Sequence, residues 1–119
     1  MKPETLLYLL TVQLNVRLRH WQTHSYAEHV ALGAFYDALD AFTDKLVETT
    51  QGINESRVLI AEGSLLSLSP MLDGDVVEML QSLQALMTME FSTERREIQN
   101  LRDDFLATVD KTLYLLTLK

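Results

Sequence analysis

Apolar residues recur at steps of three and four positions through long stretches of this chain, and few helix-breaking residues interrupt them. The sequence has only four glycines and two prolines among 119 residues. Steps of three and four place side chains on one face of an α-helix, and an apolar face is buried against another element. A chain of this length suits one domain with one core. The pattern therefore predicts an all-α fold, with one helical bundle domain over residues 1–119.

The first predicted helix runs from Glu4 to about Thr23, and Pro3 suits its first turn because proline at that position needs no N–H partner. Steps of three and four select five apolar residues as its core face: Leu7, Leu10, Leu14, Leu18 and Trp21. We expect this face, Trp21 included, to be buried.

The second predicted helix begins at Tyr26, because the sequence Ser25-Tyr26-Ala27-Glu28 has the pattern of a capping box with Ser25 as the cap. In that motif the Ser25 hydroxyl accepts an N–H of the helix, and the Glu28 carboxylate accepts the N–H of Ser25. Gly52 is the predicted C-terminal stop. The predicted core stripe of this helix consists of Leu32, Phe35, Leu39, Phe42 and Leu46.

The helical pattern loosens between Ile53 and Gly74, where Gly63 and Pro70 also mark a connection. A short helical piece is predicted within residues 57–62. A connection of this length can cross the whole length of a bundle, as in ferritin-like topology.

The third predicted helix begins at Asp75, and the last occupies the C-terminal part of the chain. Their predicted apolar faces contain Val76, Leu80, Leu83 and Met87, then Ile98, Leu101, Phe105, Val109, Leu113 and Leu116. The break between these two helices has two interpretations. Ser92-Thr93 is the best capping signal, but the apolar phase also allows a turn near Gln99-Asn100.

Composition excludes several classes of function. The net charge of -7 argues against nucleic-acid binding, which depends on lysine and arginine. No run of about 18 apolar residues predicts a membrane span. The sequence contains no cysteine, so any metal must be held by histidine and carboxylates. These features favour a soluble, cytoplasmic protein.

The candidate chemistry lies around the three histidines, His20, His24 and His29, which fall within ten residues. The second helix also carries a polar stripe at steps of three and four: His29, Gly33, Asp37, Asp40, Asp44 and Glu48. An acidic stripe on a surface helix is most often a solvated face. A stripe that begins with a histidine is also a candidate cation site.

The arrangement of these residues resembles the miniferritin, or Dps, family. His20-Trp21 is followed by His29 at the start of a long helix, and Asp44 and Glu48 fall at the offsets the family uses. The last helix, around residues 113–116, is also similar. The resemblance implies a single ferritin-like four-helix bundle domain with a long crossover between its second and third helices. It also implies an iron-oxidising site made by two histidines of one subunit and an aspartate and a glutamate of its two-fold mate.

The resemblance assigns His20, His29, Asp44 and Glu48 as metal ligands, with Trp21 as a candidate electron donor. If two copies of the second helix pack antiparallel and cross near Asp37, His29 of one faces Asp44 and Glu48 of the other, and Gly33 lets the backbones approach. The expected metal is iron, with zinc or manganese as substitutes. The expected assembly is a homo-oligomer, either a two-fold dimer or a dodecamer.

Two departures from the family pattern extend the candidate list. Gly33 stands where the family usually has a carboxylate, so Asp37 is a further candidate ligand. The turn between His20 and His29 is short, so His24 is another. An alternative interpretation is a non-enzymatic helical protein that kept the bundle, lost the oxidase and serves a structural or partner-binding role. A magnesium-dependent hydrolase ranks last, because the first helix supplies only one acid.

Overall fold

The computed structural model describes residues 1–69 and 75–118, so the predicted connection markers Pro70 and Gly74 lie outside the described residues. The described part is all-helical, which confirms the predicted fold class at the level of a four-helix bundle. The helices are α1 (Pro3–Gln22), α2 (Tyr26–Asn54), α3 (Asp75–Glu90) and α4 (Arg96–Leu115). Among the described helices, none combines the length and apolar character that a bilayer span needs.

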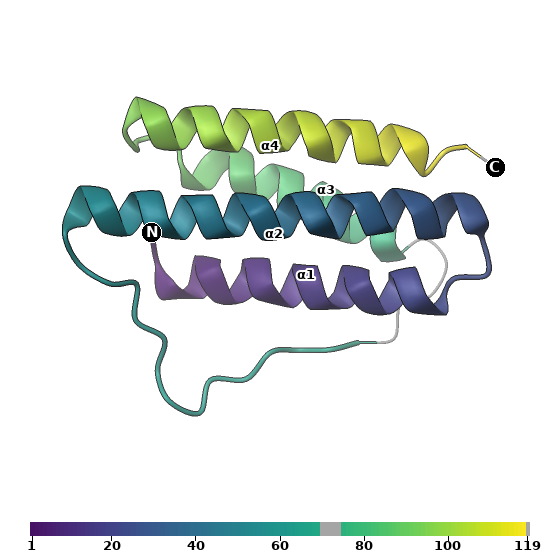
Figure 1. Cartoon of the computed structure of the whole chain (residues 1–119), viewed down its shortest axis with the longest axis horizontal. Helices are drawn as coiled ribbons and strands as arrows, with labels where there is room; N and C mark the ends of the chain where they lie inside the picture. The colour runs from purple at the N-terminus through teal and green to yellow at the C-terminus, as the bar shows by residue number, and fades with distance from the viewer. Residues whose placement is uncertain (70–74, 119) are drawn as a thin grey trace.

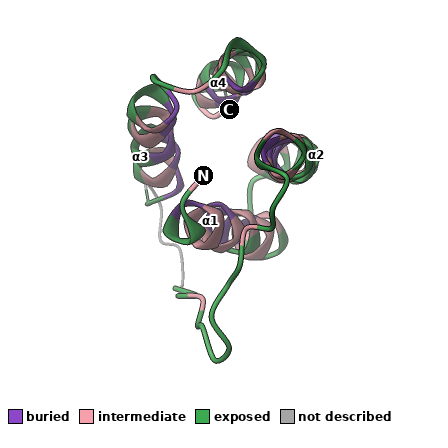
Figure 2. Ribbon diagram, turned by 90° about the vertical axis from the view of Figure 1, so that its left-hand side faces the viewer, coloured by how far each residue is buried: buried purple, intermediate pink, exposed green. Residues whose placement is uncertain are grey.

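The bundle is built from two antiparallel helix pairs joined by a long crossover (Figure 1). The crossover returns the chain along the length of the bundle, so α2 and α3 run in the same direction (Figure 1). Seen end-on, the helices follow the order α1, α2, α4, α3 around a shared core (Figure 2). All four helices contribute buried residues to that core.

Helix α2 buries the stripe that its sequence predicts. Phe35 and Leu39 are fully enclosed, and Phe42 stacks on Phe105 of α4 with 4.3 Å between ring centroids. The remaining predicted positions, Leu32 and Leu46, are also fully buried. The opposite face of α2 is polar, so only one face of this helix favours burial.

Helix α1 buries a different face from the predicted one. Leu9, Val12 and Val16 are in the core, whereas Leu14 is 37% and Trp21 63% exposed. The rest of the predicted face, Leu7, Leu10 and Leu18, is only partly buried. The prediction was wrong because α1 has apolar residues at helical spacing on two opposite faces, and periodicity does not distinguish between them.

The ends of α2 follow the predicted chemistry only in part. The N–H of Glu28 donates to the Ser25 hydroxyl at 3.2 Å, which confirms the cap. The reciprocal bond does not form, because the Glu28 carboxylate pairs with Arg19 instead. At the other end, α2 passes through Gly52 and ends at Asn54, where Glu55 takes the left-handed conformation expected of a glycine.

The crossover contains no helix within residues 57–62, contrary to the prediction. Side chains of α1 and α2 provide the backbone hydrogen bonds that a helix would otherwise make. Gln51 accepts the N–H of Val58, and buried Asn15 donates to Ser67 O and accepts from Ser69 N, at 2.9 and 3.1 Å. The amide of Asn15 thus attaches the crossover to the outside of α1.

The turn between α3 and α4 spans residues 91–95, which decides between the two predicted breaks in favour of Ser92-Thr93. Gln99 lies inside α4 rather than at a turn. Its side-chain amide donates to the carbonyls of Ser92 and Glu94 and so ties the turn to the helix.

Candidate metal centre

His20, near the end of α1, and His29, in the first turns of α2, stack on each other across the α1–α2 turn. Their ring centroids are 3.8 Å apart and the ring planes differ by 14°. His20 Nδ1 lies 2.6 Å from the carbonyl oxygen of His29, and His29 Nδ1 lies 2.8 Å from the carbonyl oxygen of His20. A carbonyl oxygen can only accept, so each Nδ1 carries the hydrogen and donates it.

This reciprocal bonding fixes the chemistry of the other ring nitrogen. In a neutral imidazole whose Nδ1 is protonated, Nε2 has the free lone pair. Within residues 1–69 and 75–118, neither Nε2 has a hydrogen-bond partner. Metal-binding histidines commonly donate the non-ligating N–H to a backbone carbonyl, which sets the tautomer and the ring orientation. The His20–His29 pair has this arrangement twice.

Gly33 lies under the ring of His20, one turn after His29. A Cβ atom at Gly33 would come within 2.8 Å of His20 Cε1, closer than real Cβ atoms lie, and within 3.2 Å of His20 Nδ1, which is a tight contact. A carboxylate at this position would displace the His20 ring from its stack. The glycine therefore leaves the space that the His20 ring occupies.

Tyr36 contacts the histidine pair, and Arg17 in turn contacts Tyr36. The edge of Tyr36 meets the His20 ring, with centroids 5.2 Å apart, and the Arg17 guanidinium lies 4.6 Å above the Tyr36 ring. Sequence analysis missed both, although helical spacing was an available signal. Arg17 is three residues before His20, and Tyr36 is seven after His29, so each shares a face with its histidine.

The predicted carboxylate ligands lie elsewhere on α2. Asp37, Asp44 and Glu48 are all exposed on the outward face of the helix. Asp44 is fifteen positions from His29, which corresponds to about 22 Å along a helix. In the described residues, no three ligand-type side chains come together. Within one copy of the chain, His20 and His29 therefore lie together, and the three predicted carboxylates lie away from them.

The other two predicted residues lie beside the pair but outside the stack. His24 is exposed in the α1–α2 turn and lines a surface pocket with five neighbours: Arg19, Gln22, Thr23, Ser25 and Glu28. Trp21 points largely into solvent, so the expectation of a buried tryptophan was wrong. An exposed indole is not shielded from water as a buried electron donor would be.

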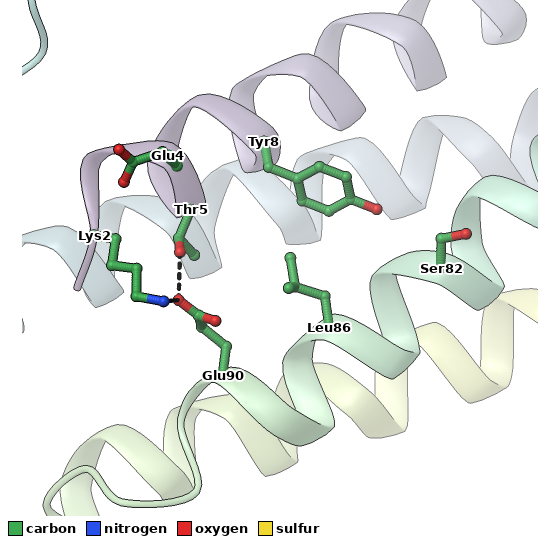
Figure 3. A pocket seen from close by; sticks show the side chains of 7 residues that line it. All are labelled: Lys2, Glu4, Thr5, Tyr8, Ser82, Leu86 and Glu90. Atoms are coloured by element: carbon green, nitrogen blue, oxygen red, sulfur yellow. Dashed lines mark hydrogen bonds and ion pairs between the residues drawn. The ribbon is translucent and has the colours of Figure 1, made fainter.

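A separate cavity of about 400 Å³ lies between α1 and α3, near the start of α1 (Figure 3). Thr5 donates to Glu90 at 2.7 Å, and Lys2 lies 4.0 Å from the same carboxylate oxygen. Burial raises the pKa of Tyr8, whose ring forms part of the wall. Lys2 and Glu90 of this cavity pair with each other, whereas His20 and His29 bring two metal-type ligands side by side, so the histidine pair is the stronger candidate site.

The fold and the paired histidines together define a four-helix bundle protein with a two-histidine surface cluster. The chain belongs to the family described as a family of unknown function, DUF5856, which it matches over residues 20–116. That match begins at His20 and includes the whole of α2, α3 and α4. No curated protein and no solved structure matches the chain.

Proposed function

We propose that this protein is a ferritin-like homo-oligomer that binds and oxidises Fe(II) at sites shared by two subunits, as the resemblance to miniferritins implies. The observation that carries the proposal is the His20–His29 pair, in which both Nδ1 atoms are hydrogen-bonded and neither Nε2 atom has a partner among the described residues. These hydrogen bonds set the tautomer and the ring orientation of both imidazoles in the metal-free protein.

The second half of the site would come from a two-fold mate. The position midway between His29 and the Asp44–Glu48 pair lies close to Asp37. Two α2 helices that cross antiparallel at this level place His29 of each opposite the acids of the other, which gives two identical sites. The exposure of Asp44 and Glu48 supports this arrangement, because both are accessible to another chain.

The donor set suits the proposed substrate. Imidazole nitrogen and carboxylate oxygen together bind Fe(II), and also Zn(II) and Mn(II). The oxidant is O2 or peroxide. Two Fe(II) ions supply the two electrons that, with two protons, convert O2 into hydrogen peroxide, or that break the O–O bond of hydrogen peroxide and give two hydroxides. The carboxylates would offset the positive charge that iron gains on oxidation.

The test is aerobic addition of Fe(II) to metal-free protein, followed by size-exclusion chromatography with iron detection. We expect iron to co-elute with an oligomer and to oxidise faster than in a protein-free blank. His29→Ala should abolish both effects, while the matched variant His24→Ala should retain them, because His24 lies outside the stack.

Equal loss in the two histidine variants would reject the assignment of the pair. Oxidation at the blank rate by the unaltered protein would reject the iron function. The remaining interpretation would then be the non-enzymatic bundle, with the acidic stripe of α2 as a solvated or partner-binding face.

A further inference from the structure

The buried stripes of α1 and α2 both end in a charged residue at the α1–α2 turn. On α1, Arg19 lies three positions after Val16 on the buried face and is itself only 7% exposed. On α2, Glu28 lies four positions before Leu32, at the next place along the buried stripe. Charged residues thus occupy the last position of each stripe, where apolar residues stand elsewhere.

These two residues form an ion pair that links the end of α1 to the start of α2. Arg19 Nε donates to Glu28 Oε1 at 2.5 Å, and most of both side chains is shielded from water. Arg19 lies in the last turn of α1 and Glu28 in the first turn of α2, so each charge also complements the dipole of its own helix. A hydrogen bond between guanidinium and carboxylate is strong and directional. It holds the two helix ends in one relative orientation.

The bundle does not need an ion pair at this position for stability. Replacing a buried ion pair with apolar residues of similar size is often neutral or stabilising, because both charges lose hydration when they are buried. Apolar side chains pack without a preferred direction, whereas a charged hydrogen bond requires donor and acceptor to be aligned. The property that the Arg19–Glu28 pair adds is therefore a fixed orientation of the two helix ends.

The histidine pair lies one residue further along each helix. His20 follows Arg19 and His29 follows Glu28, so the ion pair and the histidine pair span the same turn. The histidine hydrogen bonds lie at the surface, where water competes for both Nδ1–H groups. They form together only when the carbonyl of each histidine lies beside the ring of the other. That condition depends on how the two helix ends are oriented.

We propose that Arg19 and Glu28 are positioning residues for the metal site. Their ion pair aligns the helix ends so that His20 and His29 both donate through Nδ1 and keep Nε2 available for a metal. The inference rests on the metal site of the proposed function, but not on the oxidation of iron. Partners that orient metal-binding histidines typically change metal affinity by ten- to a hundredfold when they are removed.

The experiment measures stability and the site separately. The double variant Arg19→Met, Glu28→Leu fills the space of the ion pair with apolar side chains. We expect its thermal midpoint to equal or exceed that of the unaltered protein. Its affinity for Zn(II) in calorimetry should fall at least about tenfold, because the two imidazoles lose their fixed orientation.

Proton–nitrogen correlation NMR of the metal-free imidazoles supplies a second measurement that does not depend on metal binding. It is recorded at about pH 8, above the usual histidine pKa of about 6.5, so that both rings are neutral. The unaltered protein should show His20 and His29 with the hydrogen on Nδ1. The double variant should show a mixture of the two tautomers.

Two single variants define the cause. Glu28→Gln keeps an oxygen that accepts from Arg19, so it should retain the tautomers and most of the Zn(II) affinity. Glu28→Ala removes that acceptor and should lose both. A pocket of about 390 Å³ beside Arg19 gives water access to the guanidinium, so this variant should still fold. The matched control Arg95→Met, Glu97→Leu makes the same double change in an exposed ion pair at the start of α4 and should alter neither measurement.

Unaltered tautomers and Zn(II) affinity in Glu28→Ala or in the folded double variant would overturn the proposal, and so would equal losses in the control. If the double variant does not fold, Glu28→Ala decides by the same two measurements. Losses in Glu28→Gln as large as those in Glu28→Ala would overturn positioning by a hydrogen bond.

The tautomer spectra separate this inference from the proposed function. A protein that binds no Zn(II) and oxidises no iron would reject the proposed function, whereas tautomers that depend on Glu28 would still support the positioning role. Fixed tautomers in every variant, together with Zn(II) binding that depends on His29, would reject the positioning role alone.

Discussion

Helices α1 and α2 pack against each other, yet their sequences specify burial very differently. On α2 one face is apolar and the opposite face is acidic, and the apolar face is buried. On α1 two opposite faces are apolar, and the core uses the one with Leu9, Val12 and Val16. Periodicity identifies the buried face of a helix when the second face is polar, and it fails when both faces are apolar.

This difference also separates two kinds of outward surface. The outer face of α2 carries exposed carboxylates, whereas the outer face of α1 carries the exposed apolar side chains Leu14 and Trp21. Both lie on the same hairpin and meet at the seam where Arg17 stacks on Tyr36. Substitutions on each face should therefore have distinct consequences for stability and for function.

The largest effect on stability is expected on the buried face of α2. Phe42→Ala removes a ring that is 8% exposed and stacks on Phe105. We expect the free energy of unfolding to fall by roughly 3 to 5 kcal/mol, as for other buried phenylalanine truncations. Chemical denaturation measures the change. A loss below about 1 kcal/mol, the range of surface substitutions, would mean that this face is not the core.

The next effect compares the two faces of α1 by the same substitution. Leu9→Ala opens a cavity at a fully buried site and should cost roughly 2 to 5 kcal/mol. Leu14→Ala should cost less than about 1 kcal/mol in the monomer, because Leu14 already contacts solvent. Both are measured by denaturation at dilutions where the protein is monomeric. A larger loss of stability for Leu14→Ala than for Leu9→Ala would mean that α1 buries the face that periodicity first indicated.

The smallest effect compares two glycines of α2. Gly52→Ala should stabilise the protein by up to about 1 kcal/mol, because alanine favours helix and a Cβ there meets nothing within 4 Å. Gly33→Ala should give no such gain and should cost roughly 1 to 3 kcal/mol, because its Cβ overlaps the His20 ring. It should also weaken Zn(II) binding in calorimetry. Equal stabilisation by both variants would show that the His20 ring moves freely.

The sequence predicted the helices well because capping and spacing are local properties. Tyr26 starts α2 as its serine cap predicts, and α4 follows a turn at Ser92-Thr93. The exceptions depend on tertiary contacts. Asn15 hydrogen-bonds to the backbone of the crossover, and Glu28 pairs with Arg19 instead of completing the capping box. No local pattern reports these distant partners.

The candidate site was predictable in its residues and only partly in its reasons. The spacing of His20 and His29 across a short turn allowed them to meet, and they do. Two details depend on the conformation of the α1–α2 turn. They are the reciprocal Nδ1 hydrogen bonds and the space that Gly33 leaves for the His20 ring. In the proposed site, Asp44 and Glu48 of one subunit meet the histidine pair of the other. A contact between two subunits is not visible in one sequence or in the structure of one subunit.

Subunit complementation tests the shared site most directly. His29→Ala and Asp44→Asn each damage both sites of a two-fold dimer, so each variant alone should oxidise iron at the blank rate. In a mixed dimer one site has both defects and the other has none. Statistical mixing by co-refolding should therefore restore about a quarter of the sites of the unaltered protein. Recovery of Fe(II) oxidation near that level is the predicted result, and oxidation that stays at the blank rate in the mixture would contradict the account.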